Sequence, residues 1–193
     1  MNTALNSLRD ELASQNQRGI TFIMAAAVYW SGVGLAGLYL KPGTAFIASI
    51  WGTGMVFPLS VLLARVFGIN IFFMNALTGI GVWANMFQLF FFPVLFVVAK
   101  SNIYHPPVFM GVLVGAHFVF YHWLYRSKTY LVMAFVISAS SYSLGFFFPG
   151  NTYIVIGFST SLWLGAGALL LRIENFNALT AIHPSTQPSH VNT

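Results

Sequence analysis

Two apolar stretches of the chain, 79–99 and 108–125, contain polar side chains that can form hydrogen bonds. Asn85 and Gln88 lie about one helical turn apart in the first stretch, and His117 and Tyr121 lie four residues apart in the second. If both stretches are helices that cross a membrane, these side chains lie near the middle of the bilayer. They then either hydrogen-bond to one another and hold the helices together, or line a small polar cavity.

The residue types in these stretches exclude several kinds of chemistry. The chain has no cysteine, which excludes disulfides, thiolate metal sites and cysteine nucleophiles. We expect Asp10, Glu11 and Glu174 to lie outside the membrane, which disfavours a proton pump based on intramembrane carboxylates. His117 and His122 lie about 140° apart around a helix and cannot chelate one metal ion together. We therefore predict no metal site, no cofactor and no enzymatic activity.

The composition of the chain indicates that lipid is its main solvent. Of 193 residues, 58% are hydrophobic and 6% are charged, whereas soluble domains carry about 25% charged residues. The net charge of +5 is spread singly between apolar stretches, so it does not indicate a nucleic-acid-binding surface. The predicted environment is the lipid bilayer.

Apolar stretches of about 20 residues, each long enough to cross a bilayer, predict an all-α polytopic integral membrane protein. We expect an amphipathic segment at 1–17, a six-helix transmembrane bundle at 18–172, and a flexible polar tail at 173–193. The sequence leaves 69–78 open as a loop, an interfacial segment or part of the third helix. Pro58 should kink the second helix. The expected helices are 19–40, 44–67, 79–99, 108–125, 129–148 and 153–171.

Glycines in three of these helices are candidates for close helix–helix contact, because a residue without a side chain lets two backbones approach. The candidates are Gly32, Gly34, Gly111, Gly115, Gly165 and Gly167.

The positive charges predict the orientation. With six helices, one side of the membrane receives both termini and six Lys/Arg residues, and the other side receives only Lys41 and Lys100. Because cytoplasmic loops carry an excess of Lys and Arg, both termini are predicted to face the cytoplasm.

One pattern around the fourth helix resembles a family of small bacterial multi-pass membrane proteins that is catalogued only as a domain of unknown function. The pattern is Gly115-Ala116-His117, Tyr121, Trp123-Leu124-Tyr125-Arg126-Ser127 and Tyr130. Weaker similarity lies at Arg18-Gly19-Ile20-x-Phe22-Ile23, Phe57-Pro58-Leu59 and Gln88-Leu89, so that the resemblance spans roughly residues 15–145. It implies a bacterial inner-membrane protein and implies no activity. The apolar run 71–74 departs from the polar loop expected there.

Two functions fit these observations. The first is a non-catalytic membrane scaffold or accessory protein, with a second copy or another membrane protein as its partner. The second is a carrier or permeation protein for a small solute, which would use the polar side chains at Asn85, Gln88, His117 and Tyr121. The sequence does not identify the ligand.

Overall fold

The computed structural model describes residues 2–182, which form helices and no strand. Six helical segments are long and apolar enough to cross a membrane, as the sequence predicted: 17–39, 42–67, 78–101, 106–125, 128–147 and 152–178. The elements are α1 (Asn2–Gln15), η1 (Gln17–Gly19), α2 (Ile20–Tyr39), α3 (Pro42–Gly52), η2 (Thr53–Met55), α4 (Val56–Phe67), α5 (Thr78–Phe87), η3 (Gln88–Phe91), α6 (Phe92–Ser101), α7 (Pro106–Tyr125), α8 (Lys128–Phe147) and α9 (Thr152–Ile182).

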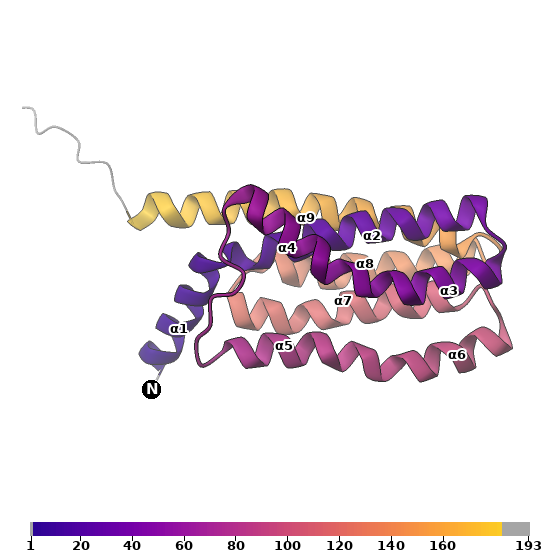
Figure 1. The fold of residues 1–193 in the computed structure, drawn as a ribbon, viewed down its shortest axis with the longest axis horizontal. Coiled ribbons are helices and arrows are strands. Elements are labelled where there is room, and N and C mark those ends of the chain that lie inside the picture. The colour runs from indigo at the N-terminus through magenta and orange to yellow at the C-terminus, as the bar shows by residue number, and fades with distance from the viewer. Residues whose placement is uncertain (1, 183–193) are drawn as a thin grey trace, which may run out of the picture.

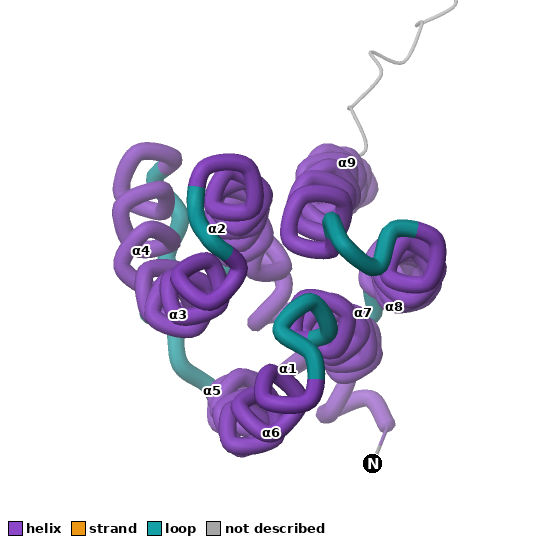
Figure 2. Tube along the Cα trace, turned by 90° about the vertical axis from the view of Figure 1, so that its right-hand side faces the viewer, coloured by secondary structure: helices purple, strands orange, loops and turns teal. Residues whose placement is uncertain are grey.

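The centre of the bundle is the chain of contacts from α2 to α9, from α9 to α8 and from α8 to α7 (Figures 1 and 2). The segment α3–α4 packs against α2, and the segment α5–α6 packs against α7 at the edge of the bundle. The fully buried side chains lie mainly on the central helices and include Trp30, Ile137, Ile156 and Leu164.

Two prolines explain why the second and third spanning segments are each divided by a 3-10 turn. A proline ring clashes with the carbonyl group four residues earlier and donates no hydrogen bond. Four residues before Pro58 is Gly54, inside η2, and four residues before Pro93 is Leu89, inside η3. The predicted kink in the second helix therefore appears as a short change of helix type.

The connection 68–77 contains no helix, and α5 begins at Thr78. Asn75 ties this connection to the N-terminal helix, because its Nδ2 donates to the Leu8 carbonyl oxygen at 2.9 Å. Its Oδ1 accepts a hydrogen bond from the Leu77 N–H at 3.0 Å, immediately before α5. The apolar run 71–74 thus belongs to a loop.

The last helix is longer than the sequence predicted. α9 continues past Leu171 to Ile182, so the predicted flexible tail is wrong for residues 173–182, and residues 183–193 lie outside the described part of the chain. The physical reason is that no glycine or proline lies between Gly167 and Pro184, and a charged residue such as Arg172 does not end a helix.

The N-terminal helix packs across one end of the bundle instead of extending away from it. Leu12 and Ala13 are each 2% exposed, and the guanidinium of Arg9 lies 4.8 Å from the centre of the Trp123 ring. Burial there, together with the nearby charge of Arg126, lowers the pKa of Arg9 from its ordinary value. The amphipathic segment is therefore an ordered part of the fold.

Lys and Arg residues divide unequally between the two ends of the bundle. We call the end that carries α1, the α4–α5 connection and the α7–α8 connection the basic end, because six Lys/Arg residues lie on its elements: Arg9, Arg18, Arg65, Arg126, Lys128 and Arg172. The opposite end carries Lys41 and Lys100.

Candidate functional site

Asn85 and Tyr121, two of the predicted site residues, meet at the contact between α5 and α7. Asn85 Nδ2 donates to the Tyr121 hydroxyl at 2.5 Å and to the Gly81 carbonyl oxygen at 3.2 Å. The Tyr121 hydroxyl donates to the same carbonyl oxygen at 3.2 Å. Tyr121 is 9% exposed. These polar groups therefore satisfy one another and join the two helices.

The ring of His117 lies against Tyr121 from the same helix. The two ring centres are 5.0 Å apart and the rings are perpendicular. Nδ1 lies 3.2 Å from the Val114 carbonyl oxygen, so Nδ1 carries the proton. Nε2 is buried and has no hydrogen-bond partner among the residues that the structure describes. His117 thus contributes one unused acceptor beside the Asn85–Tyr121 pair.

Gln88 does not join this network. Its side chain is half-buried and forms no hydrogen bond with the residues that the structure describes. Gln88 is the first residue of η3, where the chain turns more tightly than an α-helix. Although Gln88 lies three residues after Asn85, its side chain therefore does not reach Tyr121, the partner of Asn85. Within residues 2–182, no group of three or more His, Asp or Glu side chains is placed to hold a metal ion.

Four of the six candidate packing glycines lie at close contacts inside the bundle. Gly34 faces the ring of Phe158 on α9, where an added Cβ atom would lie 3.0 Å from the ring. Gly111 and Gly115 of α7 face Ser141 and Ser138 of α8, and Gly167 faces the side chain of Met133. These glycines let α2 approach α9, α7 approach α8, and α9 approach α8.

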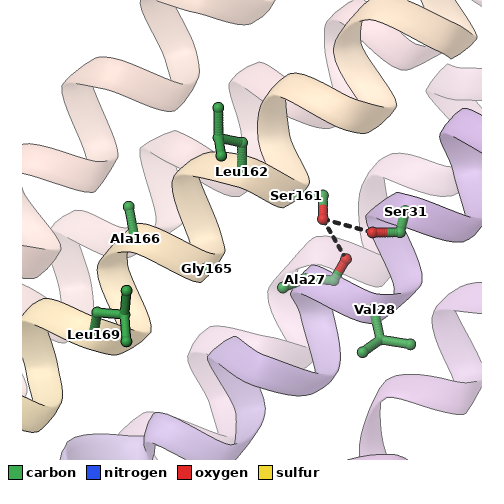
Figure 3. A pocket seen from close by; sticks show the side chains of 8 residues that line it. All are labelled: Ala27, Val28, Ser31, Ser161, Leu162, Gly165, Ala166 and Leu169. Atoms are coloured by element: carbon green, nitrogen blue, oxygen red, sulfur yellow. Dashed lines mark hydrogen bonds between the residues drawn. The ribbon is translucent and has the colours of Figure 1, made fainter.

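Gly32 and Gly165, the other two candidates, have no neighbour from residues 2–182 within 4 Å of the position that a Cβ atom would occupy. Gly165 lines an open groove of about 570 Å³ between α2 and α9 (Figure 3). The walls are apolar or small: Ala27 and Val28 on α2, and Leu162, Ala166 and Leu169 on α9. Gly32 lies one turn after Val28, on the side of α2 that borders the groove.

The polar groups of this groove are used by the protein itself. Ser161 Oγ donates to the Ala27 carbonyl oxygen at 2.8 Å, and Ser31 Oγ lies 2.7 Å from Ser161 Oγ (Figure 3). Because the Ser161 proton points to Ala27, Ser31 is the donor to Ser161. The groove therefore presents a mainly apolar surface within two membrane-spanning helices.

A second polar cluster lies at the basic end, and of its three tyrosines only Tyr121 is a site residue that the sequence predicts. The rings of Tyr121, Tyr125 and Tyr130 contact one another, with centres 5.5–5.8 Å apart. The Tyr130 hydroxyl donates to the Arg18 carbonyl oxygen at 2.6 Å, and Asn16 Nδ2 donates to the Tyr125 hydroxyl at 3.2 Å. Tyr125 and Tyr130 thus bind the turn that connects α1 to α2, and Tyr121 packs against both of them.

That turn has an unusual backbone. Gln17, Arg18 and Gly19 have φ angles of 48°, 55° and 70°. Residues other than glycine rarely adopt a positive φ angle. Each non-glycine residue in this left-handed conformation costs about 1–2 kcal/mol of conformational free energy. Hydrogen bonds from Tyr130 to the Arg18 carbonyl oxygen and from Asn175 Nδ2 to the Gln17 carbonyl oxygen hold the turn in place.

Glu174 joins three helices at the same end, although the sequence reasoning assigned it to the tail. Its Oε1 accepts hydrogen bonds from the Thr129 N–H at 3.1 Å and the Thr129 hydroxyl at 2.7 Å. Its Oε2 lies 3.9 Å from Arg18 Nε. The carboxylate therefore caps the first turn of α8 from outside that helix.

The signal that could have found this cluster is the family resemblance itself. The stretch Arg18–Ile23 and the stretch Gly115–Tyr130 are far apart in the sequence, yet Arg18 and Tyr130 are in direct contact. The two patterns therefore describe two sides of one interhelical junction.

Comparison with known proteins gives a family and no activity. Residues 5–174 match the model of a family described as a family of unknown function (DUF7010). No curated protein and no solved structure matches the chain.

Proposed function

The chain belongs to this family of unknown function, and we propose that it is a non-catalytic membrane scaffold or accessory protein that binds a transmembrane helix of a partner in the α2–α9 groove. The observation that carries the proposal is the pair of unpacked glycines, Gly32 and Gly165, beside a groove of about 570 Å³. Lipid tails are as apolar as leucine side chains, so close backbone approach at small residues is a main source of helix association in membranes.

The arrangement of the polar side chains supports this proposal. Ser31 and Ser161 bind each other and the Ala27 carbonyl oxygen, so a partner helix would cover them without leaving a polar group unsatisfied. Asn85 and Tyr121 are likewise used between α5 and α7. Such contacts join helices and leave few groups free to bind a solute in the bilayer.

A carrier for a small solute is the second candidate function. It is favoured by the buried Nε2 of His117 and by the carboxamide of Gln88, neither of which forms a hydrogen bond within the described part of the chain. A solute that donates a hydrogen bond would satisfy His117.

We place the protein in the cytoplasmic membrane of a bacterium, with both termini in the cytoplasm. Six Lys/Arg residues lie at the basic end and two at the opposite end. The positive-inside rule assigns the end with more cations to the cytoplasm.

Site-specific cross-linking in native membranes tests the docking proposal. The chain has no natural cysteine, so Leu162→Cys places one thiol in the groove, and a photoactivatable cross-linker is attached to it. We expect a discrete adduct that disappears when Gly165→Leu fills the groove. Phe135→Cys on α8, at a side chain that is 70% exposed, is the matched control and should give none.

The mass of the adduct identifies the kind of partner. An adduct of twice the chain mass means that a second copy occupies the groove, and another discrete mass means a different membrane protein. No adduct, or an adduct that Gly165→Leu leaves unchanged, would contradict the proposal.

Thiol labelling separates the scaffold from the carrier. Single cysteines at Asn85, Gln88, His117 and Tyr121 are exposed to a membrane-impermeant reagent, with cysteines at Lys41 and Lys128 as controls. A scaffold predicts fast labelling at the controls and none at the four spanning positions. Fast labelling of the spanning positions from the basic end would identify a water-filled cavity and favour the carrier.

A further inference from the structure

A small cavity of about 210 Å³ lies at the opposite end of the bundle. Three connections between spanning helices contribute to it: the α2–α3 turn, the α6–α7 connection and the α8–α9 connection. Its lining includes Leu40, Pro42, Tyr104, Asn151 and Ile154. The cavity is separate from both polar clusters described above.

Hydrogen bonds hold the walls of this cavity in place. The Tyr104 N–H donates to Asn102 Oδ1 at 2.9 Å, and the Thr152 hydroxyl donates to the Tyr104 carbonyl oxygen at 2.5 Å. The Tyr153 hydroxyl donates to the Ile103 carbonyl oxygen at 2.9 Å. These bonds tie the α6–α7 connection to the start of α9, so the cavity is formed before any ligand enters.

Close packing forms one further wall. Gly37 of α2 also lines the cavity, and a Cβ atom added there would lie 2.7 Å from Tyr153 Cβ. The glycine lets α2 approach α9 at this point, and the two helices cannot separate without losing that contact.

Two polar side chains of the lining are available to a ligand. The Tyr104 hydroxyl and the Asn151 carboxamide form no hydrogen bond with the residues that the structure describes. Each offers both a donor and an acceptor. Leu40, Ala45 and Ile154 add apolar surface, so the cavity suits a molecule with a polar group and a short hydrocarbon part.

The charge at this end selects the sign of the ligand. Lys41 lies between Leu40 and Pro42, which both line the cavity. Among the described residues, the acids Asp10, Glu11 and Glu174 lie on α1 and on the basic-end part of α9, and none lies at the opposite end. The local field is therefore positive and favours an anion.

The volume limits the size of the ligand. Pockets for drug-sized molecules measure about 300–1,000 Å³, and this cavity is smaller. From the cavity, its free polar groups and Lys41, we propose that it binds a small organic anion: a carboxylate with a short hydrocarbon chain. This inference does not depend on the scaffold function, because it needs no partner and concerns a different end of the molecule.

Butyrate is the probe that tests the proposal on the full-length protein in detergent. Because a ligand that binds only the folded state raises the unfolding temperature, butyrate should raise it saturably at constant ionic strength. Lys41→Gln should weaken the apparent affinity about tenfold or more, the loss expected from about 1.4 kcal/mol of charge-assisted binding. Lys100→Gln removes the same charge from the same end and should change the affinity less than about twofold.

Protection of an introduced thiol is a second test of butyrate binding in the cavity. Gly150→Cys places a thiol in the lining, where no described residue lies within 4 Å of an added Cβ atom, and leaves the Tyr104 and Asn151 side chains intact. Butyrate should slow its reaction with a membrane-impermeant reagent. A cysteine at Lys100 is the control and should react at an unchanged rate. Butanol, which has the same chain length and no charge, should protect neither.

Three outcomes would overturn the proposal. The first is the absence of a saturable rise in unfolding temperature up to ~100 mM butyrate. The second is an equal rise in Lys41→Gln. The third is equal protection of Gly150→Cys by butanol, which would identify an apolar additive effect without anion binding.

Discussion

Two spanning segments of nearly equal length, 17–39 and 78–101, pack in opposite ways. In the first, which contains α2, 44% of an 18-residue apolar stretch is buried inside the molecule, and in the second, which contains α5 and α6, only 6% is. Both are apolar enough to cross a membrane. Hydrophobicity therefore places both helices in the bilayer and does not decide which of them becomes central.

The difference is explained by side-chain size at the contacts. α2 approaches α9 at glycines: a Cβ atom added to Gly157 would lie 2.6 Å from Gly34 Cα. The segment α5–α6 instead carries large exposed side chains such as Trp83, Phe87 and Phe90. Since lipid competes equally for apolar side chains, only close backbone packing and polar contacts hold helices together in the membrane.

The largest expected effect comes from breaking the backbone contact between α2 and α9. Gly157→Ala forces a methyl group against Gly34, and overpacking of this kind costs about 1–3 kcal/mol or more. We expect a clearly lower unfolding temperature in detergent. Gly165→Ala on the same helix is the control and should change little, because nothing lies within 4 Å of that position. Equal effects of the two substitutions would contradict the packing argument.

A somewhat smaller effect is expected at the turn that begins α2. Gly19 has a φ of 70°, and an alanine in this left-handed conformation costs about 1–2 kcal/mol. The space around Gly19 is sufficient for a methyl group, since the nearest atom is the Tyr125 hydroxyl at 3.4 Å. Gly19→Ala should therefore lower the free energy of unfolding through backbone strain. Gly32→Ala, in the same segment, should not.

The segment α5–α6 should be held to α7 by a weaker, polar contact between Asn85 and Tyr121. The pair Asn85→Ala and Tyr121→Phe forms a double-mutant cycle across α5 and α7. Measured hydrogen bonds between membrane helices average about 0.6 kcal/mol and reach about 1.7 kcal/mol. We expect a coupling energy in this range from thermal or denaturant unfolding. A coupling of zero would mean that the 2.5 Å contact does not hold α5 to the bundle.

The smallest expected effect is at the surface of the basic end. Asp10 and Arg126 form an ion pair at 3.2 Å, but their side chains are 63% and 47% exposed. Pairs exposed in this way contribute about 0.2–1 kcal/mol and are screened by salt. Asp10→Asn should lower stability by about 0.3 kcal/mol at low ionic strength and by less at high ionic strength. A loss as large as that of Gly157→Ala would show that α1 is essential to the bundle.

Particular residues show how far the sequence alone could predict the site. Asn85, His117 and Tyr121 were identified from their helical spacing in apolar stretches, and the structure brings these three together. Gln88 satisfied the same spacing rule, but the 3-10 turn that precedes Pro93 removes it from the network. Arg172 in the sequence predicts the end of the last helix and puts Glu174 in the tail, whereas α9 continues to Ile182.

The glycines show the same limit. Periodicity identifies six small residues on three helices, but it does not say which neighbour each helix faces. The structure places Gly111 and Gly115 against serines of α8 and leaves Gly32 and Gly165 open. Of the six glycines, Gly32 and Gly165 are therefore the two without a close contact inside the described bundle.

The sequence by itself determined the environment, the number of spanning helices and the unequal division of charge between the two ends. These follow from the energy of moving each segment from water to lipid, a property that each segment has alone. Tertiary structure decided which glycines are packed, which polar groups are satisfied and how Arg18, Tyr130 and Glu174 meet. Those outcomes depend on the relative rotation and order of the helices. Hydropathy does not distinguish one arrangement of apolar helices from another, because all of them expose nearly the same apolar surface to lipid.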